Sequence, residues 1–326
     1  MTPFPVTVRG LGLGLPAGIV TNDDLAKTLD TNDEWISART GIRSRRILDD
    51  DKALSHIATI AGKEALEESG IDPQDINLTI VATVTPDTFM PATACRVAAA
   101  LGCHNSGALD LNIACSGFLY AFITACAQIK SGLAKNVLVI GGDTLSRITN
   151  WEDRRTAVLF GDGAGAAVLS VGGPGALLGY DYGAKGHLAE ALQITAGPSR
   201  PSDNPADYKT QMDGRAVFRF ATAAMVDSSR RSLAMADLPL DKVDLVVPHQ
   251  ANLRIIESAA KKWGLPMEKV CVNLDKYGNV SAGSIPIALA EAKKEGRLKP
   301  GYHVLLAGFG GGLSWGSVVL KWGNLC

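Results

Sequence analysis

The stretches Val137-Leu-Val-Ile-Gly141 and Val304-Leu-Leu-Ala-Gly308 have closely similar sequences and lie 167 positions apart in the chain. The same spacing separates Leu78 from Leu245 (245 − 78 = 167), and each of these leucines lies in another short apolar stretch. Short apolar stretches of this kind predict buried strands of an α/β sheet. Two independent strand pairs that share one offset indicate an internal duplication.

Helical periodicity precedes one repeated strand in each half, over Ala53–Ser69 and over Ala224–Met235. This alternation predicts an α/β protein whose two βα halves each build a sheet. The Gly/Pro cluster Val171-Gly-Gly-Pro-Gly175 follows a predicted strand and is typical of a junction. We therefore predict an N-terminal half at residues 1–172 and a C-terminal half at residues 173–326.

Composition excludes several classes of protein. Of the 326 residues, 46% are hydrophobic and 20% are charged, so the chain can bury a large core and is not a disordered protein. The formal net charge of −1 argues against a dedicated nucleic-acid binder. No signal-peptide pattern, membrane-spanning run or zinc-type cysteine spacing is found, and the scattered cysteines predict a reduced, cytoplasmic protein without a metal site.

Cys115 is the first candidate for chemistry. It lies in Asp110-Leu-Asn-Ile-Ala-Cys-Ser-Gly117, where a predicted strand ends near Ile113 and an apolar helix begins at Ser116. The unpaired N–H groups at a helix N-terminus favour a thiolate, so we expect the pKa of Cys115 to be lowered. Many cysteines are only small core residues, and that interpretation suits the others better; they include Cys95, Cys126 and Cys271.

His249 and Asn279 are the second and third candidates. His249 follows a predicted strand directly, where ligands bind in α/β proteins. Asn279 lies in a glycine-containing loop between a predicted strand at Val270–Leu274 and a predicted helix at Ile287–Lys294. It is 164 positions after Cys115, so we expect it to occupy nearly the same place in the second half. An asparagine in a loop usually serves to stabilise a turn. The spacing from Cys115 instead favours a position of Asn279 in the cleft.

Two glycine-rich stretches do not predict a dinucleotide site. Gly10-Leu-Gly-Leu-Gly14 is followed by Pro16 and a loop, and Gly308-Phe-Gly-Gly-Gly312 is followed by a strand. A Rossmann fingerprint requires a strand, a loop and then a helix. The second stretch could instead bring a backbone N–H close to the reacting centre.

These motifs together resemble the thiolase-superfamily condensing enzymes, and most closely the β-ketoacyl-acyl-carrier-protein synthase III family. The resemblance covers nearly the whole chain and implies a thiolase-like, five-layered αβαβα fold and a homodimer. Seven segments carry it in family order: Asp33–Ile36 with Arg39–Arg43, Thr83–Pro86, Ala114–Gly117, Phe160–Gly165, Pro248–Asn252, Gly278–Ser281 and Phe309–Gly312.

The resemblance also implies the reaction and the residues that perform it. An acyl group would pass from acyl-CoA, a substrate and not a cofactor, to Cys115, and would then condense with malonyl-acyl-carrier protein with loss of CO₂. Cys115, His249 and Asn279 would form a Cys-His-Asn triad. The N–H groups of Cys115 and Gly311 would form the oxyanion hole, and His249 and Asn279 would both donate hydrogen bonds to the malonyl thioester carbonyl.

Binding residues follow from the same resemblance. Trp35 and Arg154 would hold the CoA adenine between them, and Arg39 and Asn252 would make further CoA contacts. Phe89 and Phe309 would line the primer-acyl pocket. Arg219, Arg254, Lys261 and Lys262 would form a basic patch for the acidic carrier protein.

Three alternatives stay open on the sequence. A starter-unit ketosynthase or an acyltransferase of secondary metabolism would share the triad. A papain-type hydrolase also uses Cys, His and Asn in this chain order, although its cysteine lies in a different sequence context. A non-catalytic thiolase-fold partner is the third possibility, and the presence of all three triad residues argues against it.

Overall fold

Two mixed sheets form the frame of this computed structural model, which describes residues 4–323. The first sheet has the order β1 (Val6–Gly14), β7 (Asp162–Val171), β6 (Asn136–Thr144), β4 (Leu78–Ala82) and β5 (Gly107–Leu111). The second has the order β11 (Leu245–Pro248), β12 (His303–Gly310), β13 (Ser314–Lys321) and β8 (Ala176–Ala184). Two small two-stranded sheets flank them, β2 (Gly18–Thr21) with β3 (Ser44–Ile47) and β9 (Leu192–Gln193) with β10 (Gln211–Met212).

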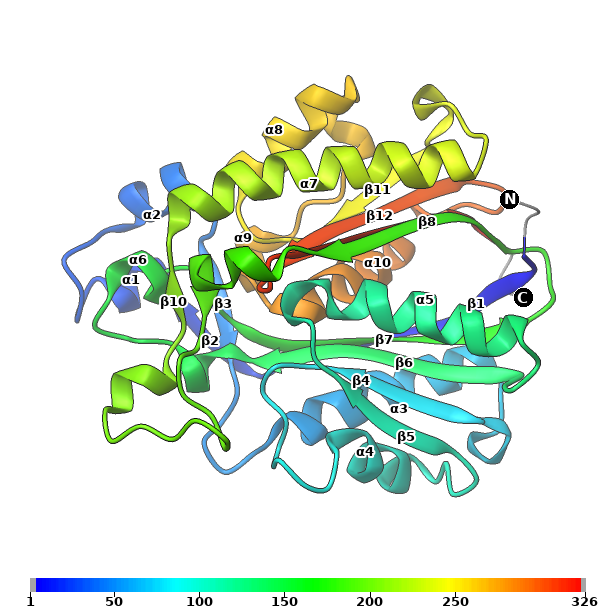
Figure 1. The fold of residues 1–326 in the computed structure, drawn as a ribbon, viewed down its shortest axis with the longest axis horizontal. Coiled ribbons are helices and arrows are strands. Elements are labelled where there is room, and N and C mark those ends of the chain that lie inside the picture. The colour runs from blue at the N-terminus through cyan, green and yellow to red at the C-terminus, as the bar shows by residue number, and fades with distance from the viewer. Residues whose placement is uncertain (1–3, 324–326) are drawn as a thin grey trace.

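Helices complete five layers (Figure 1). The helices α3 (Leu54–Ser69) and α4 (Thr93–Leu101) cover the outer face of the first sheet, and α7 (Gly214–Met235) covers the second, with α8 (Leu253–Trp263) packed against α7. Between the sheets lie α5 (Gly117–Lys130) and α10 (Ser284–Lys294). The short helices are α1 (Asn22–Leu25), α2 (Asp33–Thr40), α6 (Arg154–Ala157) and α9 (Leu274–Tyr277). The predicted five-layered αβαβα arrangement is confirmed.

The 167-residue offset is a property of the three-dimensional structure. Leu78 pairs with Val137 between the parallel strands β4 and β6, and Leu245 pairs with Val304 between the parallel strands β11 and β12. Both pairings therefore have the same register after a shift of 167. The two central helices obey the same shift, since α5 begins at Gly117 and α10 at Ser284.

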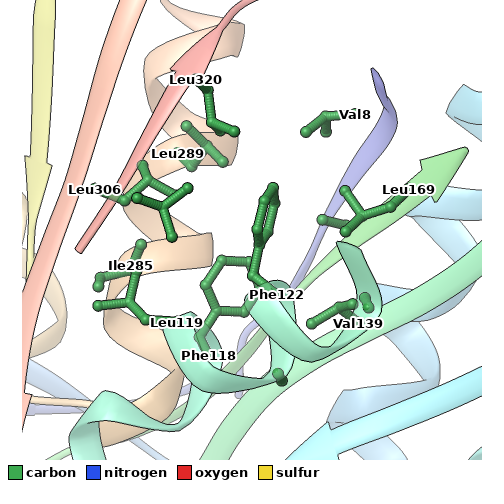
Figure 2. Close-up of a cluster of buried hydrophobic side chains, with 14 of the residues drawn as sticks. Val8, Phe118, Leu119, Phe122, Val139, Leu169, Ile285, Leu289, Leu306 and Leu320 are labelled. Carbon is green, nitrogen blue, oxygen red and sulfur yellow. The ribbon is translucent and has the colours of Figure 1, made fainter. Parts of the chain in front are cut away.

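The largest core surrounds the two central helices (Figure 2). Phe118 and Phe122 of α5 are fully buried, with ring centroids 6.0 Å apart. Apolar side chains from both sheets close around them; these include Val8, Val139, Leu169, Leu306 and Leu320. The nearly all-apolar sequence of α5 is explained by this place between two sheets.

The glycines of Gly10–Gly14 serve packing. This stretch is part of β1, and α3 crosses it so closely that a Cβ on Gly10 would lie 2.0 Å from the carbonyl oxygen of Ala65. A Cβ on Gly12 would lie equally close to the carbonyl oxygen of Ala61. Glycine is required here because helix and strand backbones touch.

One predicted strand was wrong, and one predicted helix is longer than expected. Val270–Leu274 is not a strand: only Val270 makes an isolated bridge, and α9 begins at Leu274. The Gln250 side chain takes the place of a partner strand, because it donates to the carbonyl of Cys271 and accepts from the N–H of Asn273. The helix predicted at Ala224–Met235 begins ten residues earlier, where Asp213 caps it by accepting from the N–H groups of residues 215 and 216.

The described part of the chain has no helix long and apolar enough to cross a membrane.

Candidate active site

A cavity of about 650 Å³ opens where the carboxyl ends of parallel strands from both sheets meet. Cys115 follows β5, His249 follows β11, and Asn279 follows α9, and all three line this cavity. The structure therefore brings the three candidates together from both halves of the chain. The rest of the wall is largely apolar, and includes Leu145, Ile148, Val217 and Phe309.

Cys115 lies in a one-turn 3₁₀ segment, Ala114–Ser116, that leads into α5. Ala114 has φ +48°, a left-handed conformation that is unusual for a residue with a Cβ. Burial raises the pKa of the Cys115 thiol to about 12, and the charge of Asp143 acts in the same direction. The expectation of a lowered pKa was wrong, because burial disfavours the charged thiolate.

His249 is 1% exposed and follows the last residue of β11. Neither ring nitrogen has a hydrogen-bond partner among the described residues. Burial lowers the pKa of His249 to about 3, so the imidazole is neutral at physiological pH. The edge of its ring packs against Phe309, with centroids 5.3 Å apart. The site therefore contains a neutral imidazole whose polar atoms are unpaired.

Asn279 is held at its backbone and at its side chain. Its N–H donates to the carbonyl of Leu159 over 2.8 Å, and its carbonyl accepts from the N–H of Gly161 over 3.0 Å. Its Oδ1 accepts from the N–H of Ser281 over 2.8 Å. Because Oδ1 is used in this way, Nδ2 is the end of the amide left to donate at the cavity.

The duplicated counterpart of Cys115 is Ala282, not Asn279. The 3₁₀ turn Ser281–Gly283 lies 167 positions after the turn Ala114–Ser116 and also leads directly into a central helix. Its first residue, Ser281, has φ +47°, which matches the φ of Ala114. The expectation that Asn279 occupies nearly the same place as Cys115 was therefore wrong, although both residues line the cavity.

The end of β12 approaches the Cys115 turn so closely that only glycine fits. A Cβ on Gly310 would lie 2.7 Å from the backbone nitrogen of Cys115 and 2.9 Å from that of Ser116. Gly311 follows and lines the cavity. The Gly308–Gly312 stretch therefore passes directly beside the turn that carries Cys115.

Trp35 and two arginines lie together near the cavity. The guanidinium carbon of Arg39 is 4.4 Å from the centroid of the Trp35 ring, and that of Arg154 is 5.0 Å from it. Arg154 also bonds the carboxylate of Asp30. Asn252 caps α8 through Oδ1 and donates from Nδ2 to the carbonyl of Arg39 over 3.1 Å. Trp35, Arg39 and Asn252 line the cavity, as does Arg155, which the sequence did not single out.

The two phenylalanines expected at the acyl pocket lie in different surroundings. Phe309 is 3% exposed and lines the cavity. Phe89 is 83% exposed, and within one chain it does not line the cavity. It lies in a loop beside the equally exposed Met90.

The four basic residues of the expected patch are exposed on neighbouring helices. Arg219 lies on α7, and Arg254, Lys261 and Lys262 lie on α8, which packs against it. Lys262 donates to the carbonyl of Thr222 over 3.3 Å, which ties the two helices together.

Two polar residues beside the site were missed from the sequence. Asp143 is fully buried at the end of β6, and the Ser281 hydroxyl has no hydrogen-bond partner among the described residues. Ser281 nonetheless lies close enough to lower the pKa of both Asp143 and Cys115. Applying the 167-residue offset to Gly310 and Ala114 would have pointed to these two positions.

Comparison with known proteins gives the family. Residues 109–186 match the family described as 3-oxoacyl-acyl-carrier-protein synthase III, and residues 233–322 match its C-terminal part. The chain is 48% identical over 320 residues to "Beta-ketoacyl-acyl-carrier-protein synthase III 1" of Bacillus anthracis, covering 98% of this chain and 99% of the relative.

Solved structures agree. A 3-oxoacyl-acyl-carrier-protein synthase III from Aquifex aeolicus is 46% identical, covers 97% of this chain and 100% of its own, and superposes with a TM-score of 0.92. The priming β-ketosynthase of a polyketide biosynthetic pathway has the same TM-score at 34% identity, covering 99% of this chain and 98% of its own. The chain therefore belongs to the β-ketoacyl-acyl-carrier-protein synthase III family of thiolase-like condensing enzymes.

Proposed function

We propose that this chain is an acyltransferase, a β-ketoacyl-acyl-carrier-protein synthase III that begins fatty acid biosynthesis. It transfers a short acyl group from acyl-CoA to Cys115 and condenses it with malonyl-acyl-carrier protein. The observation that carries the proposal is the meeting of Cys115, His249 and Asn279 at one largely apolar cavity. The family membership supports the same reaction.

The first half-reaction is acyl transfer. The Cys115 sulfur attacks the thioester carbonyl of acyl-CoA, and the proton of the thiol ends on the sulfur of released CoA. Negative charge develops on the carbonyl oxygen, and the N–H groups of Cys115 and Gly311 donate to it. One such donor is typically worth about 10²–10³ in rate. The glycine at position 310 supports this role because it lets β12 reach the Cys115 turn.

The second half-reaction is decarboxylative condensation. The bond between the malonyl carboxylate and its α-carbon breaks, CO₂ leaves, and the electron pair moves onto the thioester carbonyl oxygen. His249 and the Nδ2 group of Asn279 donate to that oxygen. Both are neutral donors, since burial lowers the pKa of His249 to about 3. The α-carbon then attacks the acyl-Cys115 carbonyl, and the thiolate of Cys115 leaves and is reprotonated.

Substrate binding follows the same geometry. Trp35 and Arg154 take the CoA adenine, which requires Arg154 to move from its place over the ring so that a base can stack between them. Arg39 and Asn252 contact the rest of CoA, and Phe309 lines the acyl pocket. Arg219, Arg254, Lys261 and Lys262 receive the acidic carrier protein.

We propose a homodimer and a cytoplasmic location. Exposed apolar side chains cluster near the edge strand β5 and are typical of an interface; they are Phe89, Met90 and Leu109. Phe89 would reach an acyl pocket only across such an interface. The described cysteines are all free, which suits a reducing compartment. The two halves are residues 1–172 and 173–326, since strands of the first sheet end at Val171 and those of the second begin at Ala176.

A second candidate is a starter-unit ketosynthase of secondary metabolism. The polyketide priming β-ketosynthase superposes as well as the fatty acid enzyme does, so the frame suits either acyl donor or acceptor.

The test is intact-protein mass spectrometry with a panel of acyl-CoAs, followed by malonyl-acyl-carrier protein. We expect one acyl mass on Cys115, then its loss with formation of β-ketoacyl-carrier protein and CO₂. In N279D the bond to Ser281 is kept, but a charged oxygen replaces the donor, so the acyl-enzyme should form and condensation should fall by about 10²-fold or more. Hydrolysis of the acyl group, or normal condensation by N279D, would contradict the proposal. C115A is the control for acylation elsewhere.

A further inference from the structure

Asp143 is a buried carboxylate without a basic partner among residues 4–323. Its Oδ1 accepts from the hydroxyl of Thr83 and the N–H of Val84, each over 2.7 Å, and from the N–H and hydroxyl of Thr85 over 3.2 and 3.1 Å. Each hydroxyl also accepts a backbone N–H, which leaves its own proton free to donate to Oδ1. Burial raises the pKa of Asp143, and these donors act against that rise because they stabilise the ionised carboxylate.

The other carboxylate oxygen faces the turn that follows Asn279. Oδ2 of Asp143 accepts from the N–H of Ala282 over 3.3 Å. Asn279 Oδ1 accepts from the preceding N–H, that of Ser281. Ser281 has a left-handed backbone, a conformation that persists only where its surroundings hold it. Two side chains, Asp143 and Asn279, therefore hold two successive N–H groups of this turn.

The internal duplication relates the contact between Asp143 and Ala282 to the turn that carries Cys115. Asp143 lies 167 positions before Gly310, and Ala282 lies 167 positions after Cys115. The N–H of Ala282 therefore corresponds to the N–H of Cys115. At the Ala282 turn, the neighbouring strand β6 carries Asp143, whose carboxylate oxygen accepts from the Ala282 N–H. At the Cys115 turn, the neighbouring strand β12 carries Gly310, which has no side chain, so the Cys115 N–H is left for a substrate oxygen.

We propose that Asp143 is a positioning residue for the condensation. Its carboxylate occupies, at the Ala282 turn, the position that the substrate oxyanion occupies at the Cys115 turn. By holding the Ala282 turn, it keeps the Asn279 amide in the orientation in which Nδ2 donates. This inference rests on the proposed function for the identity of the reaction. Asp143 touches no reacting atom; it acts through Ser281, Ala282 and Asn279. It also holds the Val84 segment, which lines the cavity.

The test is D143N, because its amide end would direct N–H groups at the N–H of Ala282 and displace the turn. Formation of the acyl-enzyme from acyl-CoA should be kept within a few-fold. Single-turnover condensation of that acyl-enzyme should fall by about 10²-fold, the order of loss that a misplacement of about 1 Å causes. Equal loss in both half-reactions would overturn the proposal.

A second readout is the pH profile of Cys115 alkylation by iodoacetamide, followed by peptide mass spectrometry. D143N removes a negative charge near the thiol, so the profile should move to lower pH. His249 is neutral across this range, and the charges of Arg39 and Arg155 on the cavity wall are unchanged. An unmoved profile would contradict the placement of Asp143 beside the turn.

The matched control is D181N. Asp181 lies largely buried on β8 in the second sheet, and it accepts from the guanidinium of Arg231 and from the indole N–H of Trp315. It should affect both half-reactions in proportion to the folded fraction. Should D143N fail to fold, T83V removes one donor to Asp143 and should give the same unequal loss more weakly; an equal loss in T83V would overturn the proposal. If wild-type acyl-enzyme does not condense at all, the proposed function fails, and the alkylation profile still decides whether Asp143 acts on the turn.

Discussion

His249 owes its chemistry to its surroundings. Its ring meets the Phe309 ring in a T-shaped contact, and neither nitrogen is paired within the described residues. A polar group that is buried without a hydrogen-bond partner lowers the free energy of unfolding. The presence of the unpaired His249 imidazole is explained if the ring donates a hydrogen bond to a substrate. Desolvation keeps the ring neutral and therefore able to donate without adding a positive charge to the site.

The titration of His249 predicts a pH dependence of stability. Its pKa falls from an ordinary value of 6.5 to about 3 on folding, so the unfolded chain binds the proton more readily. Stability from this group is present above pH 6.5 and is lost as the pH falls toward 3. H249N should therefore show a shallower decline in unfolding free energy between pH 6 and 4, by about 1.4 kcal/mol per pH unit. Parallel declines in urea unfolding of the two proteins would contradict a buried neutral histidine.

At the scale of elements, the site depends on how closely β12 meets the start of α5. The turn Ala114–Ser116, which carries Cys115, contains a left-handed alanine, and the strand end beside it has no side chain at Gly310. The duplicated turn Ser281–Gly283 is packed against Asp143 instead. The same supersecondary unit therefore occurs twice. The Ala282 N–H donates to Asp143 in one copy, and the corresponding Cys115 N–H has no aspartate beside it in the other.

G310A tests the close approach. The added Cβ would lie 2.7 Å from the backbone nitrogen of Cys115, so backbone must move. We expect acylation of Cys115 to slow by about 10²-fold, as for loss of an oxyanion donor. G186A is the matched control, because a Cβ at Gly186 meets nothing within 4 Å and should leave acylation unchanged. Acylation of G310A at the wild-type rate would refute the requirement for glycine.

Across the whole molecule, the proposed docking surface and the cavity share two helices. The basic residues are exposed on α7 and α8, and Val217 of α7 and Ile255 of α8 line the cavity. Clustered surface charge accelerates encounter with an acidic partner and is screened by salt.

Charge reversal on α8 should therefore affect only the step that uses the carrier protein. R254E/K261E should raise the KM for malonyl-acyl-carrier protein by about tenfold at low salt, and its rate should depend less on salt. Acylation by acyl-CoA should change little. K63E, on the outer helix α3 of the opposite layer, is the control. A comparable rise in KM for K63E would place carrier-protein binding elsewhere.

The sequence alone was sufficient for the frame and for three candidate side chains that the structure places around one cavity. Apolar strands at a constant offset determine a duplicated α/β fold, because strand burial and register depend on local pattern. Cys115 and His249 could be found because each follows a strand, and the carboxyl ends of parallel strands meet at one edge of a sheet. Asn279 was singled out after a predicted strand that the structure does not contain, and it follows α9.

The behaviour of those groups depends on contacts between segments that are remote in the sequence. The pKa of Cys115 is raised instead of lowered, because desolvation depends on which distant residues surround the thiol. Phe89 faces outward, and Asp143 lies against Ala282 although 139 residues separate them. Contacts of this kind join segments remote in sequence, so no local pattern encodes them. The sequence determined which groups are present, and long-range packing decided which of them are charged, paired or open to substrate.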